Sequence, residues 1–202
     1  MNGRLYDLLG RFEERSEIGQ RRRSLVGRLE GDVLEIGAGT GFTLKHYRKA
    51  SRVVALEPDR SMAARIPGKI AAAPAPVEVV DAEAESLPFP DESFDAVASV
   101  FVLCSVTDQA KALAEIHRVL RPGGTLNLLE HVRGHGRVAV WQDRLNPLQR
   151  RFFGNCHLNR DTKAAVARAG FDVGEVEETR IPGSCALVRD GIYGRATKIS
   201  SK

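Results

Sequence analysis

The sequence contains 202 residues, of which 43% are hydrophobic and 28% are charged, and its 30 basic and 26 acidic residues give a formal net charge of +4. These values are typical of one globular domain, and no stretch approaches the roughly 18 apolar residues that a membrane span needs. The N-terminus also lacks the apolar block of a signal peptide, so we predict a single cytoplasmic domain over residues 1–202.

Strands and helices are predicted to alternate along most of the chain. Leucines at helical spacing predict an amphipathic helix or helix pair over residues 4–29, within a helical lid at 1–30. The predicted strands cover residues 32–36, 51–57, 77–80, 95–101 and 125–130. The predicted helices cover residues 42–49, 61–66, 108–120 and 161–169. Because parallel neighbours need crossover helices, this alternation predicts an α/β fold with a doubly wound, mostly parallel sheet.

The alternation breaks at residues 131–160, which we interpret as an insertion on the substrate side of the domain. Residues 171–181 and 192–198 then predict a closing pair of strands. Between His131 and Lys163, seven Lys or Arg residues accompany only two Asp residues. That basic segment could face an anionic substrate or a lipid surface as a peripheral membrane contact, or form an ordinary solvated surface. The net charge of the chain is too small to indicate a nucleic-acid partner.

A glycine-rich loop follows the first predicted strand, where ligands bind in open parallel sheets. It contains Gly37, Gly39 and Gly41, with Ala38 between the first two. A dinucleotide loop would read G-x-G-x-x-G, but here the third glycine comes one residue early and Glu35 stands at the mouth. A carboxylate repels pyrophosphate and favours a cationic ligand, so we predict S-adenosylmethionine, which carries an ammonium and a sulfonium.

An acidic residue ends the second predicted strand, twenty residues after the first loop glycine. Glu57, followed by Pro58, lies where ribose hydroxyls are expected and can accept both of their hydrogen bonds. NAD enzymes also use such a residue, so Glu57 alone does not exclude a dehydrogenase. After the third strand, a polar side chain within residues 81–89 is expected to meet the adenine amino group. The apolar contacts predicted for the cofactor are Ala84 and Val100.

These motifs together resemble those of class I S-adenosylmethionine-dependent methyltransferases. The matching segments are residues 33–42, 54–59, 83–89 and 120–124. The resemblance covers nearly the whole chain and implies a seven-stranded, Rossmann-like sheet with Glu57 on the ribose. Alignment on Leu87-Pro88-Phe89 places Glu83 where the family usually has the Asp that meets adenine, and Asp81 is the alternative in another register.

The second half of the chain resembles the alkyl thiol methyltransferases of the methyltransferase-like family. The resemblance rests on residues 103–106, 130–132, 155–160 and 192–194. It implies a small thiol as the methyl acceptor. Those relatives begin with a membrane-anchoring apolar segment that this sequence lacks, so membrane attachment is not carried over.

The predicted catalytic residues are His131 and Cys104. His131 follows the fifth strand, and its imidazole can take a proton from an acceptor near neutral pH; the alternative is a structural hydrogen bond. Cys104 follows the fourth strand, where packing as a small apolar residue competes with chemistry. The predicted acceptor pocket, for which core packing is the alternative, consists of Tyr6, Trp141, Phe152, Phe153 and His157.

No metal is predicted, because Cys104, Cys156 and Cys185 are widely separated and form no CxxC pair. Reduced thiols are expected instead. Two functions compete with thiol methylation: methylation of a lipid head-group amine or a quinol, which the basic segment would suit, and cofactor binding by a partner protein without catalysis.

Overall fold

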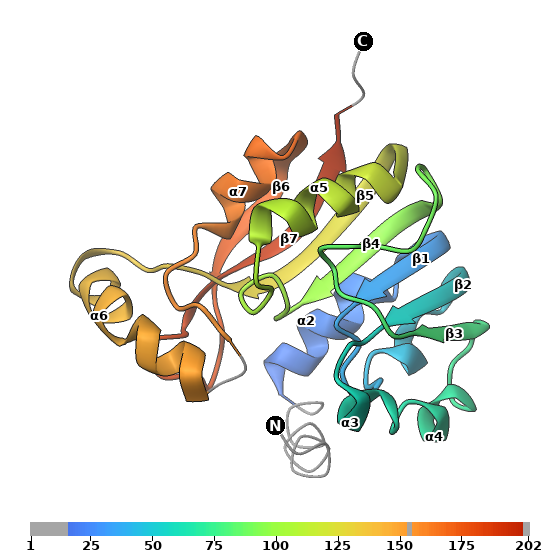
Figure 1. Ribbon diagram of the computed structural model, residues 1–202, viewed down its shortest axis with the longest axis horizontal. Helices are drawn as coiled ribbons and strands as arrows, with labels where there is room; N and C mark the ends of the chain where they lie inside the picture. The colour runs from blue at the N-terminus through green and yellow to red at the C-terminus, as the bar shows by residue number, and fades with distance from the viewer. Residues whose placement is uncertain (1–15, 153–154, 200–202) are drawn as a thin grey trace.

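The computed structural model describes residues 16–152 and 155–199, which form a seven-stranded sheet in the order β3-β2-β1-β4-β5-β7-β6 (Figure 1). The strands are β1 (Glu30–Ile36), β2 (Lys49–Leu56), β3 (Val77–Val80), β4 (Phe94–Val100), β5 (Leu120–His131), β6 (Phe171–Arg180) and β7 (Asp190–Lys198). Strands β1 to β5 are parallel, and β7 runs antiparallel to both β5 and β6. The predicted fold class is confirmed.

The helices are α2 (Glu17–Val26), α3 (Arg60–Ala63), α4 (Pro67–Ile70), α5 (Gln109–Val119), α6 (Gly136–Phe152) and α7 (Thr162–Arg168). Of these, α5 and α7 cover one face of the sheet and α2 covers the other. Alternate residues of the buried strands point to opposite faces. Leu34 and Ile36 pack in one core cluster with residues of α5 and α7, whereas Val33 packs in a second cluster with residues of α2. The two helix layers are visible in Figure 1.

Strand β1 lies at the point where the strand order reverses. It pairs with β2 on one side and β4 on the other, so the chain leaves the carboxyl ends of these strands in opposite directions. A crevice forms at such a switch point, which is where open α/β sheets bind ligands. The glycine-rich loop, Glu57 and Val100 all lie at this edge of the sheet.

Two predicted elements differ in the structure. The helix predicted at 42–49 is wrong: the segment forms one 3₁₀ turn, η1 (Leu44–His46), because β2 already begins at Lys49 and leaves no room for a longer helix. The break predicted at 131–160 contains α6, whose seventeen residues include Pro147 in their interior. No helix in residues 16–152 or 155–199 is long and apolar enough to span a membrane.

Of the lid predicted at 1–30, the structure describes α2, which packs on the sheet. Tyr6 and Phe153 lie outside the described residues.

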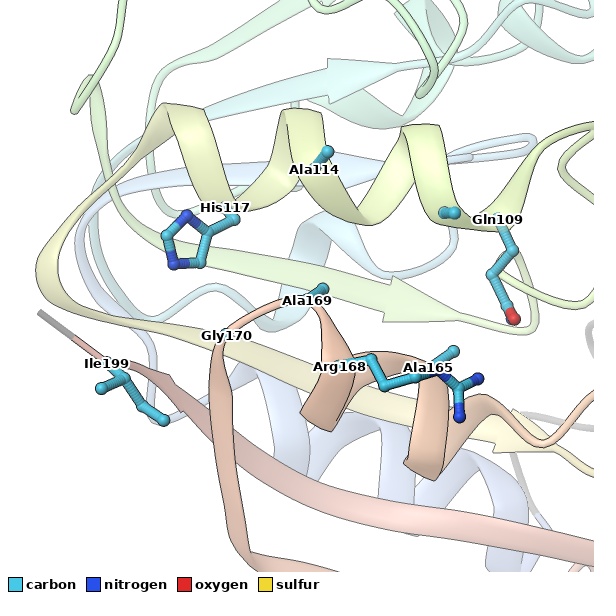
Figure 2. Close-up of a pocket in the computed structure, with 9 residues that line it drawn as sticks. Gln109, Ala114, His117, Ala165, Arg168, Ala169, Gly170 and Ile199 are labelled. Carbon is cyan, nitrogen blue, oxygen red and sulfur yellow. The ribbon is translucent and has the colours of Figure 1, made fainter. Parts of the chain in front are cut away.

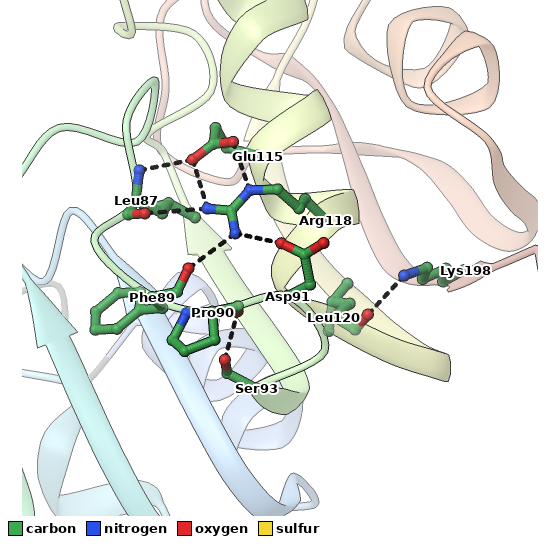
Figure 3. Close-up of polar contacts among 9 residues, drawn as sticks. All are labelled: Leu87, Phe89, Pro90, Asp91, Ser93, Glu115, Arg118, Leu120 and Lys198. Carbon is green, nitrogen blue, oxygen red and sulfur yellow. Dashed lines mark hydrogen bonds and ion pairs between the residues drawn. The ribbon is translucent and has the colours of Figure 1, made fainter.

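The loop between β3 and β4 is fastened to α5 by Arg118 (Figure 3). The guanidinium donates hydrogen bonds to the carbonyl oxygens of Leu87 and Phe89, at 3.0 and 2.8 Å, and pairs with Asp91 and Glu115. Glu115 in turn accepts a bond from the backbone N–H of Leu87 at 2.9 Å. These contacts hold the loop that was predicted to meet adenine, because they tie its backbone to a rigid helix.

Candidate active site

A pocket of about 510 Å³ opens at the switch point. Its lining comes from the carboxyl ends of β1, β2 and β4 and from the loops that follow β3 and β4. The lining residues are Arg22, Gly37, Gly39, Leu56, Glu57, Pro58, Met62, Glu83, Ala84, Glu85, Val100, Phe101, Val102, Ser105, Val106 and Thr107. This volume suits a nucleoside-sized ligand.

A larger hollow of about 860 Å³ lies between α5 and α7, away from the glycine-rich loop (Figure 2). Its walls are mostly alanine and glycine, with His117 and Arg168 at the edges, and they contain no carboxylate. The hollow therefore offers no carboxylate to ribose hydroxyls, and the switch-point pocket is the better candidate site.

Two glycines bring the backbone of the loop to the pocket wall. Gly37 and Gly39 have φ angles of +59° and +58°, in the left-handed region that favours glycine. A Cβ on Gly37 would lie 2.5 Å from a methyl group of Val102, so a side chain there would collide with the opposite wall. Gly41, also predicted as a cofactor contact, instead packs against Leu44 and Ile66 and does not line the pocket.

Glu57 lines the pocket as predicted for a ribose ligand. Its Oε2 accepts a hydrogen bond from the Gly39 N–H at 2.7 Å, and its Oε1 accepts one from the Asp59 N–H at 2.9 Å. Burial, at 7% exposure, raises the pKa of Glu57 above its ordinary value. Each carboxylate oxygen has two lone pairs, so both oxygens can still accept a bond from a ligand hydroxyl.

The sequence suggested that Glu35 stands at the mouth of the pocket, but the structure places its side chain inside the protein. It is 3% exposed, because β1 ends inside the molecule, and one of its oxygens accepts a hydrogen bond from the Thr43 hydroxyl. Its other oxygen, Oε2, is buried without a hydrogen-bond partner in residues 16–152 and 155–199. Burial raises the pKa of Glu35 to about 7. Glu35 borders a gap of about 20 Å³ beside Gly37 and Ala38, large enough for one water or ammonium group.

The side of the pocket predicted for adenine is formed by Glu83 and Ala84, opposite Pro58 and Val100, all of which line the pocket. Asp81 does not line it and lies 3.6 Å from the Arg60 guanidinium. This placement favours Glu83 over Asp81 as the predicted adenine contact.

Cys104, His131 and Cys156 come together beside the pocket, although 25 or more residues separate them in sequence. Their Sγ and ring nitrogen atoms all lie within 4.8 Å of one another, and His131 Nε2 is 2.8 Å from Cys156 Sγ. Contact with Cys104 and with His131 lowers the pKa of Cys156, and the contact with Cys156, together with burial, raises the pKa of Cys104. We refer to these three residues as the Cys–His–Cys cluster. The sequence analysis did not predict that these three residues lie together.

Backbone contacts hold the cluster in place. The carbonyl oxygen of Cys104 accepts a hydrogen bond from the His157 N–H at 2.8 Å. Arg160 donates to the carbonyl oxygens of Leu103 and Val106, both at 2.7 Å. Asn155, immediately before Cys156, has a φ of +60°, a strained conformation for a residue other than glycine. The cluster is therefore built on backbone that is fixed from several sides.

The other predicted pocket residues lie elsewhere. Trp141 and Phe152 are 53% and 66% exposed on α6 and do not line the switch-point pocket. His157 is half-buried against Cys104. Of the predicted basic segment, Arg133 pairs with Asp143 at 2.8 Å, and Arg160 is bound to backbone as described. Whether the two exposed aromatic residues contact an acceptor stays a prediction.

Comparison with known proteins identifies the family. A family model described as a methyltransferase domain matches residues 34–128. Human thiol S-methyltransferase TMT1A is 35% identical over 171 residues, which cover 82% of this chain and 70% of that protein. The chain belongs to the class I S-adenosylmethionine-dependent methyltransferases.

Two further relatives extend the comparison. The demethylmenaquinone methyltransferase of Thermus thermophilus is 37% identical over 132 residues, which cover 62% of this chain and 60% of that protein. The structure of an S-adenosylmethionine-dependent methyltransferase from Mesorhizobium loti covers 90% of this chain and 97% of its own, with a TM-score of 0.65. At 20% identity the latter likeness shows the fold alone.

The cofactor of this methyltransferase is S-adenosylmethionine, and the residues of the pocket fit it. Glu57 presents a buried carboxylate for the ribose, and Gly37 and Gly39 leave the loop backbone open. The small gap beside Gly37 and Ala38 adjoins this loop, with Glu35 and Arg22 in its wall.

Proposed function

We propose that the methyltransferase transfers the methyl group to a small thiol. The observation that carries this proposal is the similarity to a human protein named thiol S-methyltransferase, which extends over 82% of the chain. The Cys–His–Cys cluster adds support, because it places sulfur and imidazole groups beside the cofactor pocket, where an acceptor sulfur would have to lose its proton.

Positioning is the main task of the protein in this reaction. S-adenosylmethionine supplies a methyl group that its sulfonium already activates. The chain holds the donor through Glu57, Glu83 and the glycine-rich loop and keeps the wall formed by Val102 and Ser105 beside it. Holding the reacting atoms at attack distance contributes on the order of 7 to 11 kcal/mol to such a step.

A thiol is reactive as its thiolate, so the acceptor proton must leave before methyl transfer. His131 was predicted to take this proton directly. In the structure its Nε2 faces Cys156 and its Nδ1 is buried without a hydrogen-bond partner in the described part of the chain. We therefore propose that His131 acts through Cys156 and not as a free base that contacts the acceptor.

The test is the release of S-adenosylhomocysteine with a panel of acceptors: short alkyl thiols, sulfide, phosphatidylethanolamine vesicles and reduced quinones. We expect turnover with thiols. Turnover with an amine or a quinol and none with thiols would refute the proposed acceptor while leaving the methyltransferase assignment intact.

A second candidate acceptor is a quinol ring. The similarity to the Thermus demethylmenaquinone methyltransferase favours it, although that match covers less of both chains than the match to the thiol enzyme. Carbon methylation would require no thiolate, so a Cys156→Ser variant would keep its activity on quinols and lose its activity on thiols.

A further inference from the structure

The Cys–His–Cys cluster contains the donor atoms of a soft-metal site. Two sulfur atoms and one imidazole nitrogen lie within 4.8 Å of one another. In a tetrahedral zinc site, bonds of about 2.3 Å to sulfur and about 2.0 Å to nitrogen place neighbouring ligand atoms about 3.5 to 3.8 Å apart. The three ligand atoms lie near this spacing: their mutual distances do not exceed 4.8 Å, and the 2.8 Å between His131 Nε2 and Cys156 Sγ would have to widen by about 1 Å around a metal.

We propose that Cys104, His131 and Cys156 bind a zinc ion whose fourth position receives the sulfur of the methyl acceptor. Thiolate and imidazole ligands select zinc over magnesium or calcium, and zinc does not oxidise the thiols that hold it. Three protein ligands with one open position is the arrangement of catalytic zinc sites, whereas structural sites use four. The role of the fourth position rests on the proposed thiol acceptor; the metal site itself does not.

The charges around the cluster are compatible with a bound dication. Two thiolates neutralise the zinc ion, and their two protons pass to solvent when the metal binds. Arg160 and the buried carboxylate of Glu130 flank the cluster with opposite charges, so the site as a whole stays close to neutral. A neutral assembly is what a largely buried position can accommodate.

The cluster also lies where an acceptor must enter. Cys104 Sγ is 3.5 Å from the hydroxyl of Ser105, and Ser105 lines the cofactor pocket. Cys156 is only half-buried, so the cluster can be approached from the protein surface. An acceptor bound to the metal would therefore lie between solvent and the methyl donor.

With zinc bound, the metal would carry out the deprotonation that we otherwise assign to His131 acting through Cys156. On binding, the acceptor RSH gives its proton to solvent and its sulfur becomes a zinc-bound thiolate. That sulfur then forms a bond to the methyl carbon as the bond from this carbon to the sulfonium breaks, which yields RSCH₃ and S-adenosylhomocysteine. The thioether is a weaker zinc ligand than the thiolate and leaves.

Metal content provides the first test, independent of activity. Protein purified without a histidine tag or chelators is analysed for metals by mass spectrometry. We expect about one zinc per chain in the wild type and at least a fivefold lower content in Cys156→Ser and Cys104→Ser. Cys185→Ser is the matched control, because Cys185 is exposed and distant in sequence from the cluster, and it should keep its zinc. Equal zinc in wild type and Cys156→Ser would overturn the proposal.

Cobalt substitution tests the site without relying on variants that could misfold. Addition of Co²⁺ to zinc-free wild-type protein should produce sulfur-to-cobalt charge-transfer absorption and the intense visible bands of tetrahedral cobalt. A thiol should shift these visible bands if it enters the fourth position. A spectrum without charge-transfer bands would refute the site, and bands that no thiol shifts would refute the role of the fourth position.

The acceptor panel separates this inference from the proposed function. If zinc-loaded protein methylates no thiol, the metal site stands and the thiol acceptor is refuted. If protein stripped of zinc methylates thiols at the full rate, the thiol acceptor stands and the role of the metal in the reaction is refuted.

Discussion

The substitution Glu35→Gln tests the electrostatics of the cofactor loop through stability. Burial raises the pKa of Glu35 from 4.5 to about 7. The folded protein therefore binds a proton more tightly than the unfolded chain, and its stability falls as pH rises from about 4.5 to about 7 and levels off above that. One pKa unit corresponds to about 1.4 kcal/mol, so the two pKa values give a loss of about 2.5 kcal/mol between pH 5 and pH 8. Gln keeps the shape of the side chain and removes this loss.

The measurement is urea unfolding of both proteins at pH 5 and pH 8 without cofactor. Other groups with shifted pKa values, among them Glu57 and Glu130, contribute equally to both proteins. The difference between the two proteins isolates Glu35: relative to wild type, the variant should gain about 2.5 kcal/mol on going from pH 5 to pH 8. If the stability of the two proteins showed the same pH dependence, the pKa of Glu35 would lie in its ordinary range in the protein without cofactor, and the reasoning would be refuted.

Three further substitutions test the remaining parts of the cofactor site. Glu57→Gln places an amide against the N–H groups of Gly39 and Asp59, and calorimetry should show S-adenosylmethionine affinity at least about tenfold lower; unchanged affinity would contradict the ribose role. Gly37→Ala forces a Cβ against Val102 at a φ of +59°, which should cost about 1 to 3 kcal/mol in urea unfolding; wild-type stability would contradict the close approach. Arg118→Met removes the hydrogen bonds that tie the loop before β4 to α5, so amide hydrogen exchange in this loop should accelerate. The KM for S-adenosylmethionine should rise severalfold with little change in kcat, and unaltered exchange would show that the loop is ordered without Arg118.

The fold could be predicted because its signals are local. Each buried strand is a short apolar run, and each helix such as α5 repeats apolar residues at helical spacing. The segment at 42–49 was harder, because its apolar residues Leu44 and Tyr47 are three apart, which suits a 3₁₀ turn as well as a helix. Helix α6 was missed because Pro147 suggested a break, whereas the helix accommodates it in its interior.

The position of the switch-point pocket could be predicted for a similar reason, because Glu57 ends one predicted strand and the glycines follow another, whereas the burial of Glu35 could not. The Cys–His–Cys cluster could not, because it depends on tertiary structure. Cys104 follows β4 and His131 is the last residue of β5, and the carboxyl ends of these two parallel strands meet at one edge of the sheet. Cys156 joins the cluster because the chain turns back toward the sheet after α6, a helix that the sequence analysis did not predict.

One buried carboxylate connects the two halves of the site. Glu130, at the end of β5, accepts hydrogen bonds through Oε1 from the Ser99 hydroxyl and from the N–H groups of Val102 and Leu103, at 2.6, 2.9 and 3.1 Å. Val102 forms the pocket wall opposite the glycine-rich loop, and Leu103 precedes Cys104 of the cluster. If the backbone at Val102 or Leu103 moved away, the buried Glu130 carboxylate would lose a hydrogen-bond donor, which costs about 1 to 3 kcal/mol or more. The separation between the cofactor pocket and the cluster is therefore set before any ligand binds, which is what in-line transfer to the proposed thiol acceptor would require.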